Sequence, residues 1–73
     1  MTRNRETLGS RLRQARTDAG YSIQRLAREL DVDPRTVNRW QADKAVPSIV
    51  RLGELARVLG KPVSYFIPDD DGQ

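Results

Sequence analysis

The sequence predicts an all-α fold, a compact domain of five helices, on three observations. Apolar residues recur at helical spacing in successive short segments. Residues that cap helix N-termini precede three of these segments, at Ser22, Asp33 and Ser48, and glycines that end helices follow two, at Gly20 and Gly60. Because a chain of 73 residues allows one domain that buries only about 60% of its unfolded surface, the helices must share one small core.

The first two predicted helices are amphipathic. Over residues 7–19 one helical face carries Leu8, Leu12, Ala15 and Ala19. After Ser22 a second face, with the spacing i, i+3, i+4 and i+7, carries Ile23, Leu26, Ala27 and Leu30. Both faces are expected in the core.

A third helix is predicted over residues 34–43, because Asp33 can cap it and Pro34 suits its first position. At about 100° per residue, Arg35 and Arg39 lie about 40° apart, on the side opposite Val37 and Trp40. We therefore expect Val37 and Trp40 to anchor this helix in the core. Its two arginines then face outward, one turn apart, where they can read an anionic partner in a groove.

The last two helices follow a connector over residues 45–47, in which Pro47 disfavours helix at the preceding residue. After Ser48 the core-spaced residues are Ile49, Leu52, Leu55, Ala56 and Leu59. Gly53 interrupts this helix at a cost of about 1 kcal/mol relative to alanine, unless close packing requires it. A short helix over about 63–66 completes the five.

The second and third helices, with the segment that follows them, resemble the helix-turn-helix of the phage repressor and Cro type, also called the xenobiotic response element family. The matching residues are Leu26, Ala27, Leu30, Val32, Thr36, Val37, Arg39, Trp40, Lys44, Pro47, Ser48 and Leu52. The resemblance implies a lambda-repressor-like helix-turn-helix domain over residues 7–67. It also implies sequence-specific binding of double-stranded DNA by a transcriptional regulator of the repressor type, with helix 34–43 in the major groove.

Candidate DNA contacts fall into two groups. Arg35 and Arg39 can each donate two hydrogen bonds to guanine, and Thr36 and Asn38 can contact thymine and adenine. A phosphate contact or plain solvent exposure stays open for each of these four, as does a bond from Thr36 back to its own helix. Phosphate contacts are predicted at Ser22, Gln24 and Lys44, the first of them beside a helix N-terminus.

Four positions depart from the family pattern, one of them Pro34, which lacks the side chain that many relatives use to contact bases. The family usually has glutamine at Ile23, glutamate at Gln41 and glycine at Asp43. Ile23 cannot contact phosphate, and Arg16, the family's partner for that glutamate, is left with a charge–neutral hydrogen bond to Gln41 unless it turns to Asp18 or to phosphate. Asp43 tolerates a left-handed backbone but brings a negative charge towards the DNA. These departures leave open a protein-interaction module, such as an antitoxin or adaptor, on the same fold.

The charge balance favours a nucleic-acid partner. Eleven arginines and two lysines oppose ten acids, for a net charge of +3. Three of the acids lie at residues 69–71, and setting them aside leaves thirteen cations against seven acids, or +6. Arginine suits phosphate and guanine, although a solvated surface of mixed charge is the plainer interpretation.

Several function classes are excluded or not supported. Without cysteine or histidine there is no disulfide, no Cys/His zinc site and no histidine acid–base chemistry. The serines lack a histidine to activate them and the acids form no metal or acid–base pattern, so we expect no enzyme, cofactor, metal or small-molecule ligand. No apolar run approaches the roughly 20 residues of a membrane span and no signal peptide opens the chain, so we expect a cytoplasmic protein with no membrane partner.

Both ends of the chain leave alternatives open. Residues 1–6 form a predicted flexible basic arm, through Arg3 and Arg5, or simply a frayed terminus, and residues 68–73 a predicted disordered acidic tail. Tyr65, Phe66 and Ile67 either cap the core or form the contact of a homodimer that reads an operator of two half-sites about 34 Å apart. The chain could be a complete small regulator or one domain of a longer protein.

Overall fold

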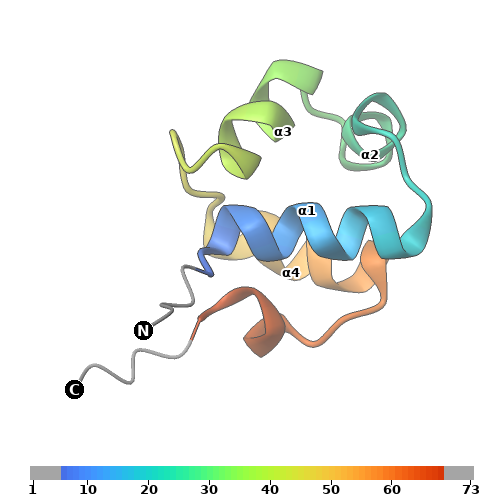
Figure 1. Ribbon diagram of the computed structural model, residues 1–73. Coiled ribbons are helices and arrows are strands. Elements are labelled where there is room, and N and C mark those ends of the chain that lie inside the picture. Colours follow the sequence, from blue (N-terminus) through green and yellow to red (C-terminus); the bar gives the residue numbers. More distant parts are fainter. Residues whose placement is uncertain (1–5, 69–73) are drawn as a thin grey trace.

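The computed structural model describes residues 6–68, which form four α-helices and one 3-10 helix (Figure 1). In chain order these are α1 (Leu8–Ala19), α2 (Ile23–Leu30), α3 (Pro34–Gln41), α4 (Ile49–Leu59) and η1 (Val63–Phe66). The all-α prediction is confirmed. The predicted basic arm and acidic tail, apart from Glu6 and Pro68, lie outside the described residues.

Two predicted elements differ from the structure. The fifth helix is a single 3-10 turn, because the four residues of η1 are held by short-range bonds in which the Tyr65 and Ile67 amides donate to the carbonyls of Pro62 and Ser64. The helix predicted over 34–43 ends at Gln41. It stops there because Asp43 adopts a left-handed backbone with φ of 60°, which a continuing helix does not allow.

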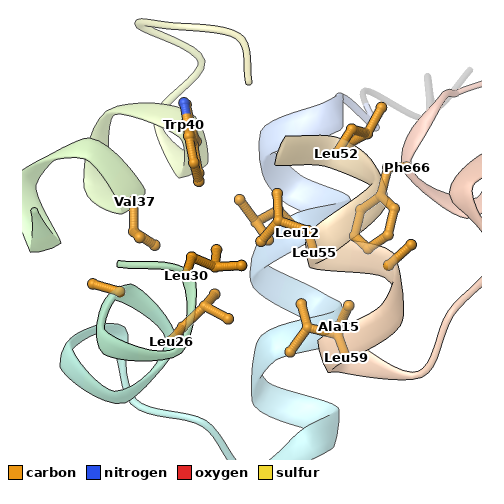
Figure 2. Close-up of a cluster of buried hydrophobic side chains, with 12 residues drawn as sticks. Leu12, Ala15, Leu26, Leu30, Val37, Trp40, Leu52, Leu55, Leu59 and Phe66 are labelled. Carbon is orange, nitrogen blue, oxygen red and sulfur yellow. The ribbon is translucent and has the colours of Figure 1, made fainter. Parts of the chain in front are cut away.

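Figure 1 shows three layers. Helices α1 and α4 lie together in the middle, α2 and α3 lie on one side of them, and η1 lies on the other side. The buried core runs through all three layers (Figure 2) and consists of Leu12, Ala15, Leu26, Ala27, Leu30, Val37, Trp40, Leu52, Leu55, Ala56, Leu59 and Phe66. This arrangement leaves the outer faces of α2 and α3 on a surface of the domain away from η1.

Most of the predicted core is confirmed, and the exceptions lie at helix ends. Leu8 and Ile23 are partly buried against the core. Ala19, the last residue of α1, and Ile49, the first residue of α4, are exposed. Helical spacing places these end residues on the apolar face of their helices, but it does not indicate whether another element covers that position.

The helix starts follow the sequence closely. Ser22, Asp33 and Ser48 cap α2, α3 and α4 as predicted, each accepting a hydrogen bond from a backbone amide in the first turn. Thr7 caps α1 in a reciprocal box with Ser10. Gly20 and Gly60 end α1 and α4 with φ of 77° and 72°. None of the helices within residues 6–68 has the length and apolar character needed to cross a membrane.

Candidate nucleic-acid interface

Helix α3 is anchored by one face and exposed on the other. Val37 and Trp40 are buried in the core (Figure 2), as predicted. Arg35, Asn38 and Arg39 are exposed, and Thr36 is half-buried. Because the two faces are on opposite sides of a short helix, packing of Val37 and Trp40 fixes the direction in which the polar side chains project.

The N-terminus of α3 is held by Asp33, whose Oδ1 atom accepts a hydrogen bond of 2.8 Å from the Arg35 amide. This backbone hydrogen bond, followed by those from the Arg35 guanidinium, lowers the pKa of Asp33 below its ordinary value of 3.8. The Nε atom of the Arg35 guanidinium is 3.4 Å from Asp33 Oδ1, which is long for an ion pair, and the Arg35 side chain is 87% exposed. An exposed ion pair at that distance is weak, so Arg35 can leave Asp33 for a base or phosphate at little cost.

The C-terminus of α3 is tied to the start of α1 through Asp43. Its Oδ2 atom accepts a hydrogen bond of 2.6 Å from the Thr7 hydroxyl, and its Oδ1 atom accepts one of 2.9 Å from the Gly9 amide. We call this pair of bonds the Asp43 clasp. The Asp43 carboxylate therefore lies at the N-terminus of α1, where a negative charge is stabilising.

Gly9 is required by the close approach of α3 to α1. A Cβ atom on Gly9 would lie 2.5 Å from the Gln41 carbonyl oxygen and 2.7 Å from both the Trp40 carbonyl oxygen and Asp43 Oδ1. Two of these three neighbours are backbone atoms, which cannot move aside cheaply. Sequence reasoning missed Gly9, because nothing near it in the chain indicates that a second helix end approaches there.

Arg16 makes the second link between α1 and α3. Its Nε atom donates to Gln41 Oε1 at 2.6 Å, and its Nη1 atom donates to the Tyr21 carbonyl at 2.7 Å. The charge–neutral bond to Gln41 that the sequence left open is therefore formed, and Asp18 instead accepts from Gln14. Arg16 thus secures the middle layer to the last turn of α3 without an acidic partner.

The predicted phosphate contacts lie near two helix ends. Ser22 and Gln24 are exposed at the start of α2, and Lys44 is exposed three residues beyond α3. Ser22 Oγ accepts from the Arg25 amide at 3.0 Å, which leaves its hydroxyl hydrogen available as a donor. Sequence reasoning gave Arg25 no specific contact, yet its guanidinium stacks 4.3 Å from the centre of the Tyr21 ring.

The three candidate dimer residues have different positions. Phe66 is fully buried in the core (Figure 2), so it cannot contact a second copy. Tyr65 is half-buried, with Arg11 and Lys61 over its ring at 5.6 and 4.7 Å. Ile67 is 53% exposed. Of the three, only Ile67 presents substantial apolar surface, and the core-capping alternative holds for Phe66.

Helices α2 and α3 are both short, and the turn between them begins at Asp31, whose backbone is left-handed. Helix α3 is anchored by an apolar face and exposed on the opposite face. This arrangement defines a helix-turn-helix domain. The model of the helix-turn-helix family matches residues 12–66. The chain belongs to this family, as its resemblance to the Cro and phage-repressor type predicts.

Similar proteins agree with this assignment. The SPbeta prophage-derived uncharacterized HTH-type transcriptional regulator YonR of Bacillus subtilis (strain 168) is 31% identical over 65 residues, 89% of this chain and 60% of YonR. The HTH-type transcriptional regulator RamB of Mycobacterium tuberculosis is 31% identical over 64 residues, 88% of this chain and 14% of RamB. The chain therefore spans only part of the length of these relatives.

Among solved structures, the N-terminal DNA binding domain of SinR from Bacillus subtilis has a TM-score of 0.76 and 26% identity, covering 88% of this chain and 94% of that one. Apo-HppE has the same score and identity, but the match covers only 34% of its chain, against 84% of this one. The SinR match shows that this arrangement of helices occurs as nearly the whole of a solved domain.

Proposed function

We propose that this chain binds double-stranded DNA sequence-specifically, as the DNA-binding domain of a transcriptional regulator of the repressor type. The observation that carries the proposal is the orientation of α3, which buries Val37 and Trp40 and projects Arg35 and Arg39 outward. The regulators YonR and RamB and the SinR domain support the same function by similarity. Helix α3 is the element that enters the major groove.

Arg35 and Arg39 read bases in this proposal, with Thr36 and Asn38 as further contacts at the edges of the same face. Ser22, Gln24 and Lys44 hold phosphates on either side of the groove. Two copies bind as a homodimer to an operator of two half-sites, since one eight-residue helix reads only a few base pairs.

The test is selection of bound duplexes from a random pool, followed by titration of the winning sequence with the wild type, Arg35→Ala and Arg39→Ala. A lost bidentate contact is worth about 1–3 kcal/mol, so each variant is expected to bind roughly 5- to 150-fold more weakly and to lose preference at one base pair. Arg57→Ala is the matched control, because Arg57 is exposed on α4 and its replacement removes the same charge.

Salt dependence provides a second readout. Log affinity is expected to fall with log salt with a slope of about −0.9 for each neutralised phosphate, and Lys44→Ala is expected to reduce that slope by about one unit. If the pool yields no motif and binding stays weak at low salt, the proposal is wrong. A protein partner for the same fold is then the next hypothesis to test.

A further inference from the structure

The side chain of Arg25 lies over an aromatic ring at the start of α2. Its guanidinium carbon is 4.3 Å from the centre of the Tyr21 ring, which is a close cation–π contact. Arg25 is exposed, whereas Tyr21 is half-buried and packs against the core. The contact therefore places an exposed cation on a ring that the core holds. We call the two residues the Tyr21–Arg25 stack.

The backbone of Tyr21 is fixed on both sides by Arg16. The Tyr21 amide donates to the Arg16 carbonyl at 3.0 Å, and the Tyr21 carbonyl accepts from Arg16 Nη1 at 2.7 Å. The same guanidinium donates to Gln41, the last residue of α3, at 2.6 Å. An arginine that rests on a fixed ring has less rotamer freedom to lose when it binds a partner, so the stack lowers the entropy cost of a contact.

The charge of Arg25 has no acidic partner within residues 6–68. The ion pairs in that part of the chain join Arg11 to Glu6, Arg35 to Asp33, Arg51 to Glu54 and Lys61 to Asp18. Helix α2 also has no acidic residue in its first turn, where the helix dipole disfavours a cation such as Arg25. The fold therefore leaves the Arg25 charge available to an anionic partner.

We propose that Arg25, held on the Tyr21 ring, binds a backbone phosphate of the duplex and so fixes the position of α2 on the DNA. This inference rests on the proposed function. Helices α2 and α3 lie on the same side of the α1 and α4 layer (Figure 1), and Arg25 is exposed while Leu26 and Leu30 bury the opposite side of α2. In a helix-turn-helix the first helix crosses the DNA backbone while the second lies in the major groove.

The geometry of the Tyr21–Arg25 stack suits a phosphate. A guanidinium that stacks by its flat face keeps the N–H donors at its edge free, and one phosphate can accept from two of them. Such a contact carries no base information, so Arg25 sets the orientation of the domain and not its choice of sequence. Because Arg16 binds both Tyr21 and Gln41, a phosphate held by Arg25 is tied to the last turn of the base-reading helix.

The experiment titrates two duplexes over a range of salt concentrations. One is the duplex from the selection, and the other is the same duplex with one base pair of the selected motif changed. Arg25→Ala is expected to weaken both by the same factor and to reduce the slope of log affinity against log salt by about 0.9. Arg28→Ala is the matched control, because Arg28 is exposed one turn further along α2 and makes no cation–π contact within residues 6–68. It is expected to leave the slope nearly unchanged.

Two variants of Tyr21 test the ring itself. Tyr21→Leu keeps an apolar side chain but removes the aromatic face, so it is expected to weaken both duplexes about 2- to 5-fold with the wild-type salt slope. Tyr21→Phe keeps the face and is expected to bind like wild type. Urea unfolding of each variant establishes that the titrated protein is folded. A purely structural role for Tyr21 would lower stability without changing the affinity of the folded protein.

Four results would overturn the inference. These are a wild-type salt slope for Arg25→Ala, loss of preference at one base pair in that variant, an equal loss of slope in Arg28→Ala, and equal affinities for Tyr21→Leu and Tyr21→Phe. Failure of the wild type to prefer the selected duplex over the changed one would instead reject the proposed function itself.

Discussion

The Asp43 clasp gives a prediction that compares two aspartates with the same backbone. Asp31 and Asp43 both have φ of 60°, a left-handed conformation that costs a non-glycine residue about 1 kcal/mol. The Asp31 side chain is exposed at the C-terminus of α2, where its negative charge is unfavourable. Asp31→Gly is therefore expected to stabilise the domain by about 0.5–1 kcal/mol.

Asp43→Gly relieves the same backbone strain but removes two hydrogen bonds to a carboxylate. Hydrogen bonds to charged groups are worth about 1.5 kcal/mol each at the low end, which suits these partly exposed bonds of 2.6 and 2.9 Å. Subtracting about 1 kcal/mol of relieved strain leaves a net destabilisation of about 2 kcal/mol. For a domain of this size that lowers Tm by about 8–16 °C.

Urea unfolding followed by circular dichroism measures both variants, with an unchanged m-value as the check that compactness is preserved. Asp43→Asn is the intermediate case, because an amide oxygen can still accept from Gly9 and asparagine tolerates the left-handed backbone. If Asp43→Gly is as stable as Asp31→Gly, the clasp contributes nothing and the reasoning fails.

Three further outcomes follow from contacts described above. The hydrogen bonds that lower the pKa of Asp33 stabilise the fold fully above about pH 4, and this stabilisation is lost as the pH falls through the lowered pKa. The difference in unfolding free energy between wild type and Asp33→Ala, measured in urea, should therefore shrink from about pH 5 to about pH 2. A Cβ on Gly53 meets nothing within 4 Å, so Gly53→Ala should stabilise the domain by about 1 kcal/mol. Gly9→Ala should instead destabilise it, because its Cβ would meet backbone atoms of α3. Equal shifts of Tm for the two variants would contradict the close approach of α3 to α1. Gln41→Glu should turn the bond to Arg16 into an ion pair and raise stability by about 0.5–1 kcal/mol, a gain that thermal melts should find reduced at high salt.

Local signals account for what the sequence predicted well. Ser22, Asp33 and Ser48 mark helix starts because a capping side chain bonds to an amide two or three residues away. Helix geometry alone separates the two sides of α3, so it places Val37 and Trp40 in the core and the two arginines on the outer face. The roles of these arginines in reading bases remain predictions.

Contacts between distant residues account for what was missed. The end of α3 depends on Asp43, whose carboxylate bonds to residues 34 and 36 positions earlier in the chain. Arg51 similarly donates to the Leu30 carbonyl at 2.7 Å, which secures the end of α2 to α4. Neither pairing has a periodic trace in the sequence, and the exposure of Ile49 cannot be predicted without knowing where its neighbouring helices end.

The Asp43 clasp also has a consequence for local motion. The Gly9 amide lies in the first turn of α1, yet its acceptor is the carboxylate of Asp43, just beyond the end of α3. That amide exchanges its hydrogen with solvent only when the clasp opens. Its exchange rate in heavy water therefore reports how often the clasp between the end of α3 and the start of α1 opens.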